Sequence, residues 1–159
     1  MIEFKKVEIE DREWVQPLLD YSGYNCLEYS FTFTYLWRNI FKYRIARVND
    51  YLVLKSVRKN YPVSYLFPAG RGDIDPVLDM IYEDAKTAGE ELVFHTLIPE
   101  HKEILEKKWP GKFEYIDLED YYDYIYETEK LITLSGKKLA SKRNHINRFK
   151  DNNPDWSYE

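Results

Sequence analysis

Residues 63–89 read VSYLFPAGRGDIDPVLDMIYEDAKTAG, and this run predicts a strand, a glycine-containing loop and a helix in direct succession. The β-rich run Val63–Phe67 ends at Pro68, which has no amide proton to donate to a sheet. Beyond the loop, Pro76 suits a first helical turn and Gly89 suits the position after the last. The apolar residues between them share one helical face: Val77, Met80, Ile81 and Ala85. Two glycines therefore lie beside a helix N-terminus, where backbone amides can meet an anion.

The sequence on either side predicts further strands and helices. Upstream we expect, in order, a strand at Phe4–Ile9, helices over Asp11–Ser22 and Phe31–Ile40, and strands at Tyr43–Val48 and Tyr51–Val57. Downstream we expect a strand at Leu92–Leu97, a helix over Pro99–Lys108, and strands at Phe113–Leu118 and Tyr121–Tyr126. The succession β-α-α-β-β-β-α-β-α-β-β predicts an α/β domain with a mixed central sheet and helices on both faces.

This order of elements resembles that of the GNAT acyltransferases, in which a central strand leads to a loop and helix N-terminus that hold a pyrophosphate. The resemblance implies a GNAT-like acyl-CoA N-acyltransferase fold over residues 1–127. Residues 128–159 would then form a separate basic helical segment.

The composition is that of a folded domain in a reducing compartment. The 159 residues suffice for one core, and the aromatic share of 17% supplies large rings to fill it. A single cysteine, Cys26, excludes an internal disulfide and a cysteine cluster for zinc, so we expect no metal site. Long apolar runs and a signal peptide are both missing from the sequence. We therefore expect a soluble, cytoplasmic protein without a transmembrane segment.

Positive charge is concentrated near the end of the sequence. Residues 130–150 hold seven Lys or Arg and no Asp or Glu, which leaves 16 basic and 28 acidic residues elsewhere. The segment thus carries +7 and the remainder −12. An acidic protein is not a general nucleic-acid coat, but a local basic stripe can hold one phosphate-bearing ligand or an anionic partner.

Gly70, Arg71 and Gly72 are the candidate cofactor-binding residues, with coenzyme A or acyl-CoA as the candidate ligand. Glycines let backbone amides approach a phosphate, and Arg71 could add a charge-assisted contact. Asp73 and Asp75 follow at once and would repel the same phosphate. The alternative is a plain turn that caps the next helix.

Tyr122, Tyr124 and Tyr126 alternate with Asp123 and Ile125, so a strand would place the three rings on one face. Such a ladder could stack a nucleobase, or it could simply pack beneath the terminal helix.

The basic segment predicts a helix from Lys137 to about Asp151. At 100° per residue, Leu139, Ile146 and Phe149 form an apolar sector. Lys142, Arg143 and Lys150 project into or beside that sector, and cations beside a packing surface need an acidic partner or an anionic ligand. The alternative is that their alkyl stems lie on the core while the charged groups stay in water. The candidate substrate-binding residues are Lys138, Lys142, Arg143, Asn144 and Asn147.

Several motifs resemble an uncharacterised bacterial family grouped with the phosphatidylglycerol lysyltransferase C-terminal domain. The most specific motifs are LSGKKL (134–139) and KRNHINRF (142–149), and weaker ones are YLW (35–37), FPxG (67–70) and YIY (124–126). The resemblance implies a tandem pair of GNAT-like domains related to the FemABX transferases, which move an amino acid from aminoacyl-tRNA to an amine or hydroxyl. This sequence would supply the N-terminal half, and the second domain would lie beyond Glu159.

Three functions follow from the residues and from this resemblance. The first is one half of an acyl or aminoacyl transferase that uses acyl-CoA or aminoacyl-tRNA and is inactive by itself. The second is a non-catalytic scaffold whose basic helix docks on a partner domain. The third is a module that binds tRNA through the basic helix and the tyrosines. No catalytic residue is predicted.

Overall fold

The computed structural model describes residues 2–119, 122 and 124–158. The chain divides into two compact units, which we call unit 1 (Met1–Ile116) and unit 2 (Asp117–Glu159). Among the described residues, no helix combines the length and the apolar character needed to cross a bilayer.

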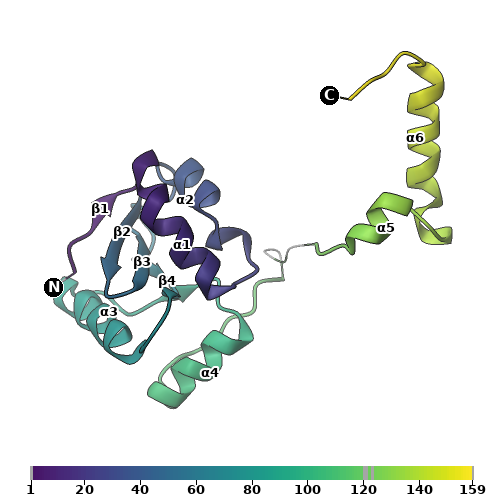
Figure 1. Ribbon diagram of the computed structural model, residues 1–159. Helices are drawn as coiled ribbons and strands as arrows, with labels where there is room; N and C mark the ends of the chain where they lie inside the picture. The colour runs from purple at the N-terminus through teal and green to yellow at the C-terminus, as the bar shows by residue number, and fades with distance from the viewer. Residues whose placement is uncertain (1, 120–121, 123, 159) are drawn as a thin grey trace. The chain divides into compact units, whose positions relative to one another are not determined.

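Unit 1 is built on a mixed six-stranded sheet (Figure 1). Its strands are β1 (Lys5–Lys6), β2 (Tyr43–Val48), β3 (Tyr51–Ser56), β4 (Ser64–Leu66), β5 (Ala69–Gly70) and β6 (Phe94–His95). The order is β1-β2-β3-β4-β6, with β5 paired to β3. The β4–β6 pair is parallel and the other pairs are antiparallel. The three strands predicted over residues 43–67 thus form an antiparallel meander at the centre of the sheet.

Two helices cover one face of this sheet. α1 (Arg12–Ser22) buries Val15, Leu18 and Leu19, and it follows the 3-10 turn η1 (Ile9–Asp11). A second 3-10 turn, η2 (Leu27–Tyr29), leads into α2 (Phe31–Trp37), whose first turn is capped by the Ser30 hydroxyl. These helices pack on the side chains of β2 and β3 that alternate toward them, including Ile45, Leu52 and Leu54.

The opposite face of the sheet is covered by α3 (Asp75–Ala88). Its buried side chains include Val77, Ile81 and Ala85, three of the four residues that the sequence placed on one helical face. They pack against Val53 and Tyr65, which alternate to this side of β3 and β4. The expected α/β class, with helices on both faces of a mixed sheet, is therefore confirmed.

A third core cluster joins the last helix of unit 1 to the rest. α4 (Pro99–Lys108) buries Leu105, which packs with Phe67 and Leu78. This cluster lies where the chain leaves β4, so α4 helps to fix the start of the glycine loop.

The strand predicted at Phe113–Leu118 does not form, which corrects the sequence interpretation. Alternating residues form a strand only beside a partner, and the neighbouring strand β6 is two residues long. Phe113 instead packs on Phe94 and Trp109, with ring centroids 6.0 and 5.9 Å away. Ile116 is 75% exposed.

Other element ends differ from the sequence prediction. β1 is confined to Lys5–Lys6 rather than Phe4–Ile9, and β6 to Phe94–His95 rather than Leu92–Leu97. In the range Tyr121–Tyr126, Tyr121 and Asp123 lie outside the described residues, and the others are not in a strand.

The described residues of unit 2 include three helical segments after residue 127. These are α5 (Thr128–Thr133), the 3-10 turn η4 (Lys137–Leu139) and α6 (Ala140–Asn152). The sequence prediction of a basic helix is confirmed, since α6 spans most of the expected range. None of the described residues of unit 2 is buried.

Candidate functional site

Gly70 lies in β5, directly opposite Tyr51 of β3. A Cβ atom at this position would lie 2.1 Å from the Asp50 carbonyl oxygen and 2.7 Å from the Tyr51 Cα atom. No side chain fits such a gap, because backbone atoms cannot yield as a flexible side chain can. The contact between two strands therefore accounts for glycine at position 70 without any ligand.

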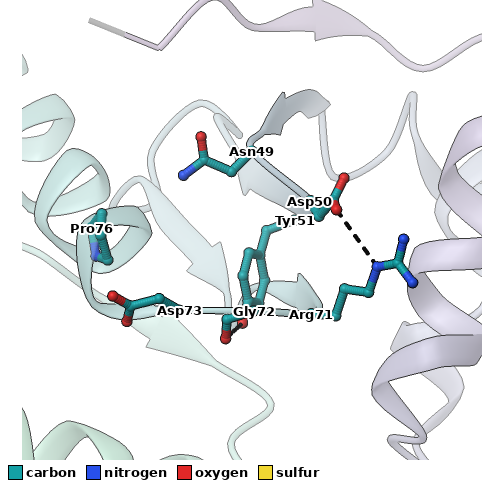
Figure 2. A pocket seen from close by; sticks show the side chains of 7 residues that line it. All are labelled: Asn49, Asp50, Tyr51, Arg71, Gly72, Asp73 and Pro76. Carbon is teal, nitrogen blue, oxygen red and sulfur yellow. Dashed lines mark hydrogen bonds and ion pairs between the residues drawn. The ribbon is translucent and has the colours of Figure 1, made fainter.

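Arg71 is held by the turn between β2 and β3. Its backbone amide donates to the Asp50 carbonyl at 3.1 Å, and its Nε lies 3.5 Å from an Asp50 carboxylate oxygen. Figure 2 shows the Arg71 side chain directed at Asp50. The hydrogen bond from Arg47 and the charge of Arg71 lower the pKa of the Asp50 carboxyl. Part of the positive charge of Arg71 is thus already offset by Asp50.

A shallow pocket surrounds this loop, and it is acidic. Asp50 and Asp73 both line it with Arg71, so the lining holds two carboxylates and one guanidinium, and Figure 2 joins only Asp50 to Arg71. The Tyr51 hydroxyl donates to the Gly72 carbonyl at 2.8 Å and fixes the loop from the other side. These contacts favour the structural alternative for Gly70, Arg71 and Gly72.

The N-terminus of α3 already has an acidic group beside it. The Asp73 carboxylate accepts a hydrogen bond from the Asp75 amide at 3.1 Å. A carboxylate in this position satisfies a helix amide and interacts favourably with the helix dipole. A phosphate bound there would have to displace or repel it.

The basic helix of unit 2 gives Arg143 an internal role. Its Nη1 donates to the Leu134 carbonyl, and also to the Gly136 carbonyl at 3.0 Å. These bonds fasten the turn between α5 and α6, in which Leu134 and Gly136 both have positive φ angles. Arg143 therefore orders the segment and is half-buried there.

The other four candidate residues of this segment face solvent. They are Lys138, Lys142, Asn144 and Asn147, and all are exposed. Within the described part of the chain, neither Lys138 nor Lys142 forms an ion pair. Lys130, by contrast, pairs with Glu127 at 2.9 Å. The segment thus presents cations without internal counterions, as an anion-binding surface would.

The comparisons with known proteins decide the family. The family described as "Phosphatidylglycerol lysyltransferase, C-terminal" matches residues 23–159. The chain belongs to this family. The match includes the glycine loop, strands β2 to β6 of the sheet and all of unit 2. Membership also supports the GNAT-like assignment of the fold.

Two proteins that are similar to this chain show how much of a longer protein it covers. The crystal structure of a conserved protein of unknown function from Bacteroides thetaiotaomicron is 33% identical with a TM-score of 0.92. The similarity covers 100% of this chain and 53% of that one, so the chain spans about half the length of the solved protein. An uncharacterised protein of Mycoplasmoides gallisepticum is 59% identical over 27 residues, which are 17% of this chain and 9% of that protein.

The tyrosine ladder does not form in this member of the family. Tyr124 is 88% exposed and Tyr126 is 60% exposed, and neither lies in a strand. The Tyr122 hydroxyl donates to the Asp117 carboxylate at 2.6 Å, a hydrogen bond that raises the pKa of Tyr122. The three rings therefore offer no ordered stacking face within the described residues.

His101 is a buried polar residue that sequence reasoning left without a role. Its ring stacks on Phe67 at 4.1 Å between centroids, and Tyr24 meets it edge-on at 4.3 Å. Nδ1 accepts a hydrogen bond from the Ile98 amide at 3.3 Å. Among the described residues, Nε2 meets no acceptor. The sequence did contain a signal for this role. His101 is the third residue of the helix that begins at Pro99, and a side-chain acceptor at that position can cap a helix.

Proposed function

We propose that this chain is the N-terminal part of an acyl or aminoacyl transferase and that unit 2 helps to hold a phosphate-bearing donor. The observation that carries the proposal is the family match over residues 23–159, which contains the whole basic segment. Lys138 and Lys142 supply the chemistry, because both are exposed and form no ion pair among the described residues, and a phosphate-bearing donor binds to positive charge.

Aminoacyl-tRNA is the donor we favour. The pocket at Gly70–Gly72 carries two carboxylates, which oppose binding of the pyrophosphate of coenzyme A. Unit 2 presents two exposed lysines, Lys138 in η4 and Lys142 in α6, and two exposed asparagines of α6, Asn144 and Asn147. These side chains suit contacts to backbone phosphates and sugars, in which lysine supplies charge and asparagine supplies hydrogen bonds.

The proposed partner of unit 2 is a second GNAT-like domain of the same protein. The solved relative is about twice as long as this chain, which leaves room for such a domain. Unit 2 also exposes apolar side chains that a partner surface would cover, namely Leu131, Ile132, Ile146 and Phe149. In this arrangement the reaction takes place in the complete protein, through positioning and electrostatic stabilisation.

A non-catalytic scaffold is the second candidate. The same exposed Ile146 and Phe149, beside the cations of α6, would suit docking on an acidic partner surface. In this case the positive charge would meet carboxylates of the partner rather than phosphates of a donor.

Isothermal titration calorimetry separates the two candidates. The chain of residues 1–159 is titrated with aminoacyl-tRNA, with deacylated tRNA and with coenzyme A. We expect heat with both tRNA samples and little with coenzyme A, because the pocket at Gly70–Gly72 is acidic. The scaffold predicts no heat with any of them, and a strong response to coenzyme A alone would contradict our choice of donor.

A further inference from the structure

A second pocket lies at the edge of the sheet in unit 1, where β1 and β2 separate. β1 pairs with β2 at two positions, Lys5 with Ile45 and Lys6 with Arg44. Beyond these pairs, the pocket is lined by residues 7–10 after β1 and by Tyr35, Arg38, Asn39, Lys42 and Tyr43 before and at the start of β2. Its lining includes four cations, Lys6, Arg38, Lys42 and Arg44, and two carboxylates, Glu8 and Glu10.

None of the four cations is paired with a carboxylate in the described part of the chain. Arg38 donates to the Tyr35 carbonyl, and its guanidinium carbon lies 3.7 Å from the centre of the Tyr35 ring. Arg44 donates through Nη1 to the Tyr43 carbonyl at 3.0 Å. Both arginines are half-buried as whole residues. Each has five N–H groups, so most of their donors remain available.

The strand register places like charges together. Lys6 lies directly opposite Arg44 across the β1–β2 pair, and like charges in this position destabilise a sheet. Lys55 lies opposite Arg44 on the other side, in β3. Lys55 has an internal counterion, because its Nζ lies 2.6 Å from an Asp84 carboxylate oxygen. Among the described residues, Lys55 of β3 thus has a carboxylate partner, whereas Lys6 of β1 and Arg44 of β2 have none.

The two carboxylates of the lining offset only part of this positive charge. Glu8 and Glu10 act on Lys5, whose pKa is raised first by its hydrogen bond to Asp11 and then by nearby carboxylates, including these two. Lys5 is not among the residues that line the pocket. Four cations against two carboxylates leave a charge of +2 in the lining, which matches the charge of a phosphate dianion.

We propose that this pocket binds a phosphate group, carried either by a soluble small molecule or by a lipid headgroup. Arg38 and Arg44 would donate to the phosphate oxygens, since a guanidinium presents parallel N–H groups that match them. Lys6 and Lys42 would add charge from the rim. The proposal concerns unit 1 and does not depend on the function proposed for unit 2.

NMR spectroscopy of the arginine side chains tests the pocket directly. The ¹⁵N-labelled chain is titrated with inorganic phosphate and with pyrophosphate. The Nε–H signals of Arg38 and Arg44 should shift together and saturate, while that of Arg12, which is exposed on α1, stays in place. Arg44→Gln should weaken binding by at least about tenfold. Lys59→Gln is the charge-matched control, because Lys59 is exposed and lies outside the pocket, and it should change the affinity less than about twofold.

Lys42→Gly provides a variant that keeps the fold. Lys42 has a φ of 54°, a conformation that glycine adopts without strain, so the variant should be at least as stable as the original chain. It nevertheless removes a cation from the pocket and should weaken phosphate binding several-fold.

Vesicles identify the source of the phosphate. Sedimentation with phosphatidylcholine vesicles is compared with and without phosphatidylglycerol. Binding that needs the anionic lipid and is lost in Lys42→Gly and Arg44→Gln indicates a lipid headgroup. Binding of free phosphate or pyrophosphate without vesicle binding indicates a soluble ligand. The proposal is overturned if neither anion moves the Arg38 and Arg44 signals and vesicle binding is the same in all variants.

Discussion

At the scale of single residues, the clearest energetic feature is a charged cluster between the sheet and α3. The Asp84 carboxylate accepts from Lys55 Nζ at 2.6 Å and from the Tyr65 hydroxyl at 2.7 Å. The side chain of Asp84 is 9% exposed and that of Lys55 is 16% exposed. Burial, and then the bond to Asp84, raise the pKa of the Tyr65 hydroxyl. The cluster ties two strands to one helix, and each member depends on the other two.

Asp84→Asn should therefore be strongly destabilising. The variant leaves Lys55 largely buried without its counterion, which costs about 3 kcal/mol of unfolding free energy. Urea unfolding followed by circular dichroism measures the change. Glu83→Gln is the matched control on the same helix, because its ion pair with Lys86 spans 3.5 Å and is exposed at both ends. We expect the control to change stability by less than about 1 kcal/mol, and equal effects would contradict the role of the cluster.

His101 should make the protein less stable in acid. Burial lowers its pKa to about 4, whereas an unfolded histidine titrates near 6.5. Between these values the unfolded chain binds a proton that the folded chain does not, so the unfolding free energy falls as the pH drops from about 6.5 to 4. Denaturation at a series of pH values measures this slope.

His95 contributes in the same direction, because burial lowers its pKa to about 4 as well. Replacing His101 alone, as His101→Phe, should therefore reduce the slope without abolishing it. His145→Gln serves as the control, since His145 is exposed on α6. An unchanged slope in His101→Phe would show that His101 is not the titrating group.

At the scale of elements, strands and helices with an internal partner could be predicted from the sequence. β2 and β3 pair with each other over six residues, and each alternates apolar side chains to both faces. α3 was predicted from its apolar face and its Pro76 start, and it forms as expected. The strand expected at Phe113–Leu118 does not form. The alternation of apolar and polar residues suits a strand, but it does not show whether a neighbouring strand is present to pair with it.

The turn between α5 and α6 depends on Arg143. We expect Arg143→Ala to remove its bonds to the Leu134 and Gly136 carbonyls and to speed amide exchange across residues 134–143. The loss corresponds to about 1 kcal/mol in local opening free energy. Hydrogen exchange with mass spectrometry measures it. Lys142→Ala, one position away, makes no such bond and should leave the exchange unchanged. Equal acceleration in both variants would refute the structural role of Arg143.

At the scale of the whole molecule, the two units differ in what holds them together. Unit 1 contains three core clusters of buried side chains, whereas none of the described residues of unit 2 is buried. A helix of the length of α6 is only marginally stable alone. The exposed apolar residues of unit 2 fit a segment that acquires its full stability against a ligand or partner.

The candidate site could be predicted only in part. The basic segment was visible because seven cations in 21 residues without an acid stand out in any sequence. The internal role of Arg143 was hidden, since its acceptors are backbone carbonyls that no residue pattern marks. Of the two carboxylates beside Gly70–Gly72, only one could be predicted from the sequence. Asp73 is adjacent in sequence, but Asp50 reaches the loop through the pairing of β3 with β5.

The salt dependence of tRNA binding tests whether Lys138 and Lys142 contact the phosphates of a donor. The logarithm of the binding constant is measured against the logarithm of salt concentration for the original chain, for Lys138→Ala/Lys142→Ala and for the control Lys59→Ala/Lys107→Ala. All four lysines are exposed, so the variants should fold. We predict that the first double variant binds more weakly and reduces the slope by about 1 to 2, while the control keeps both affinity and slope. Identical slopes in all three proteins, or no binding of tRNA by the original chain, would contradict the account.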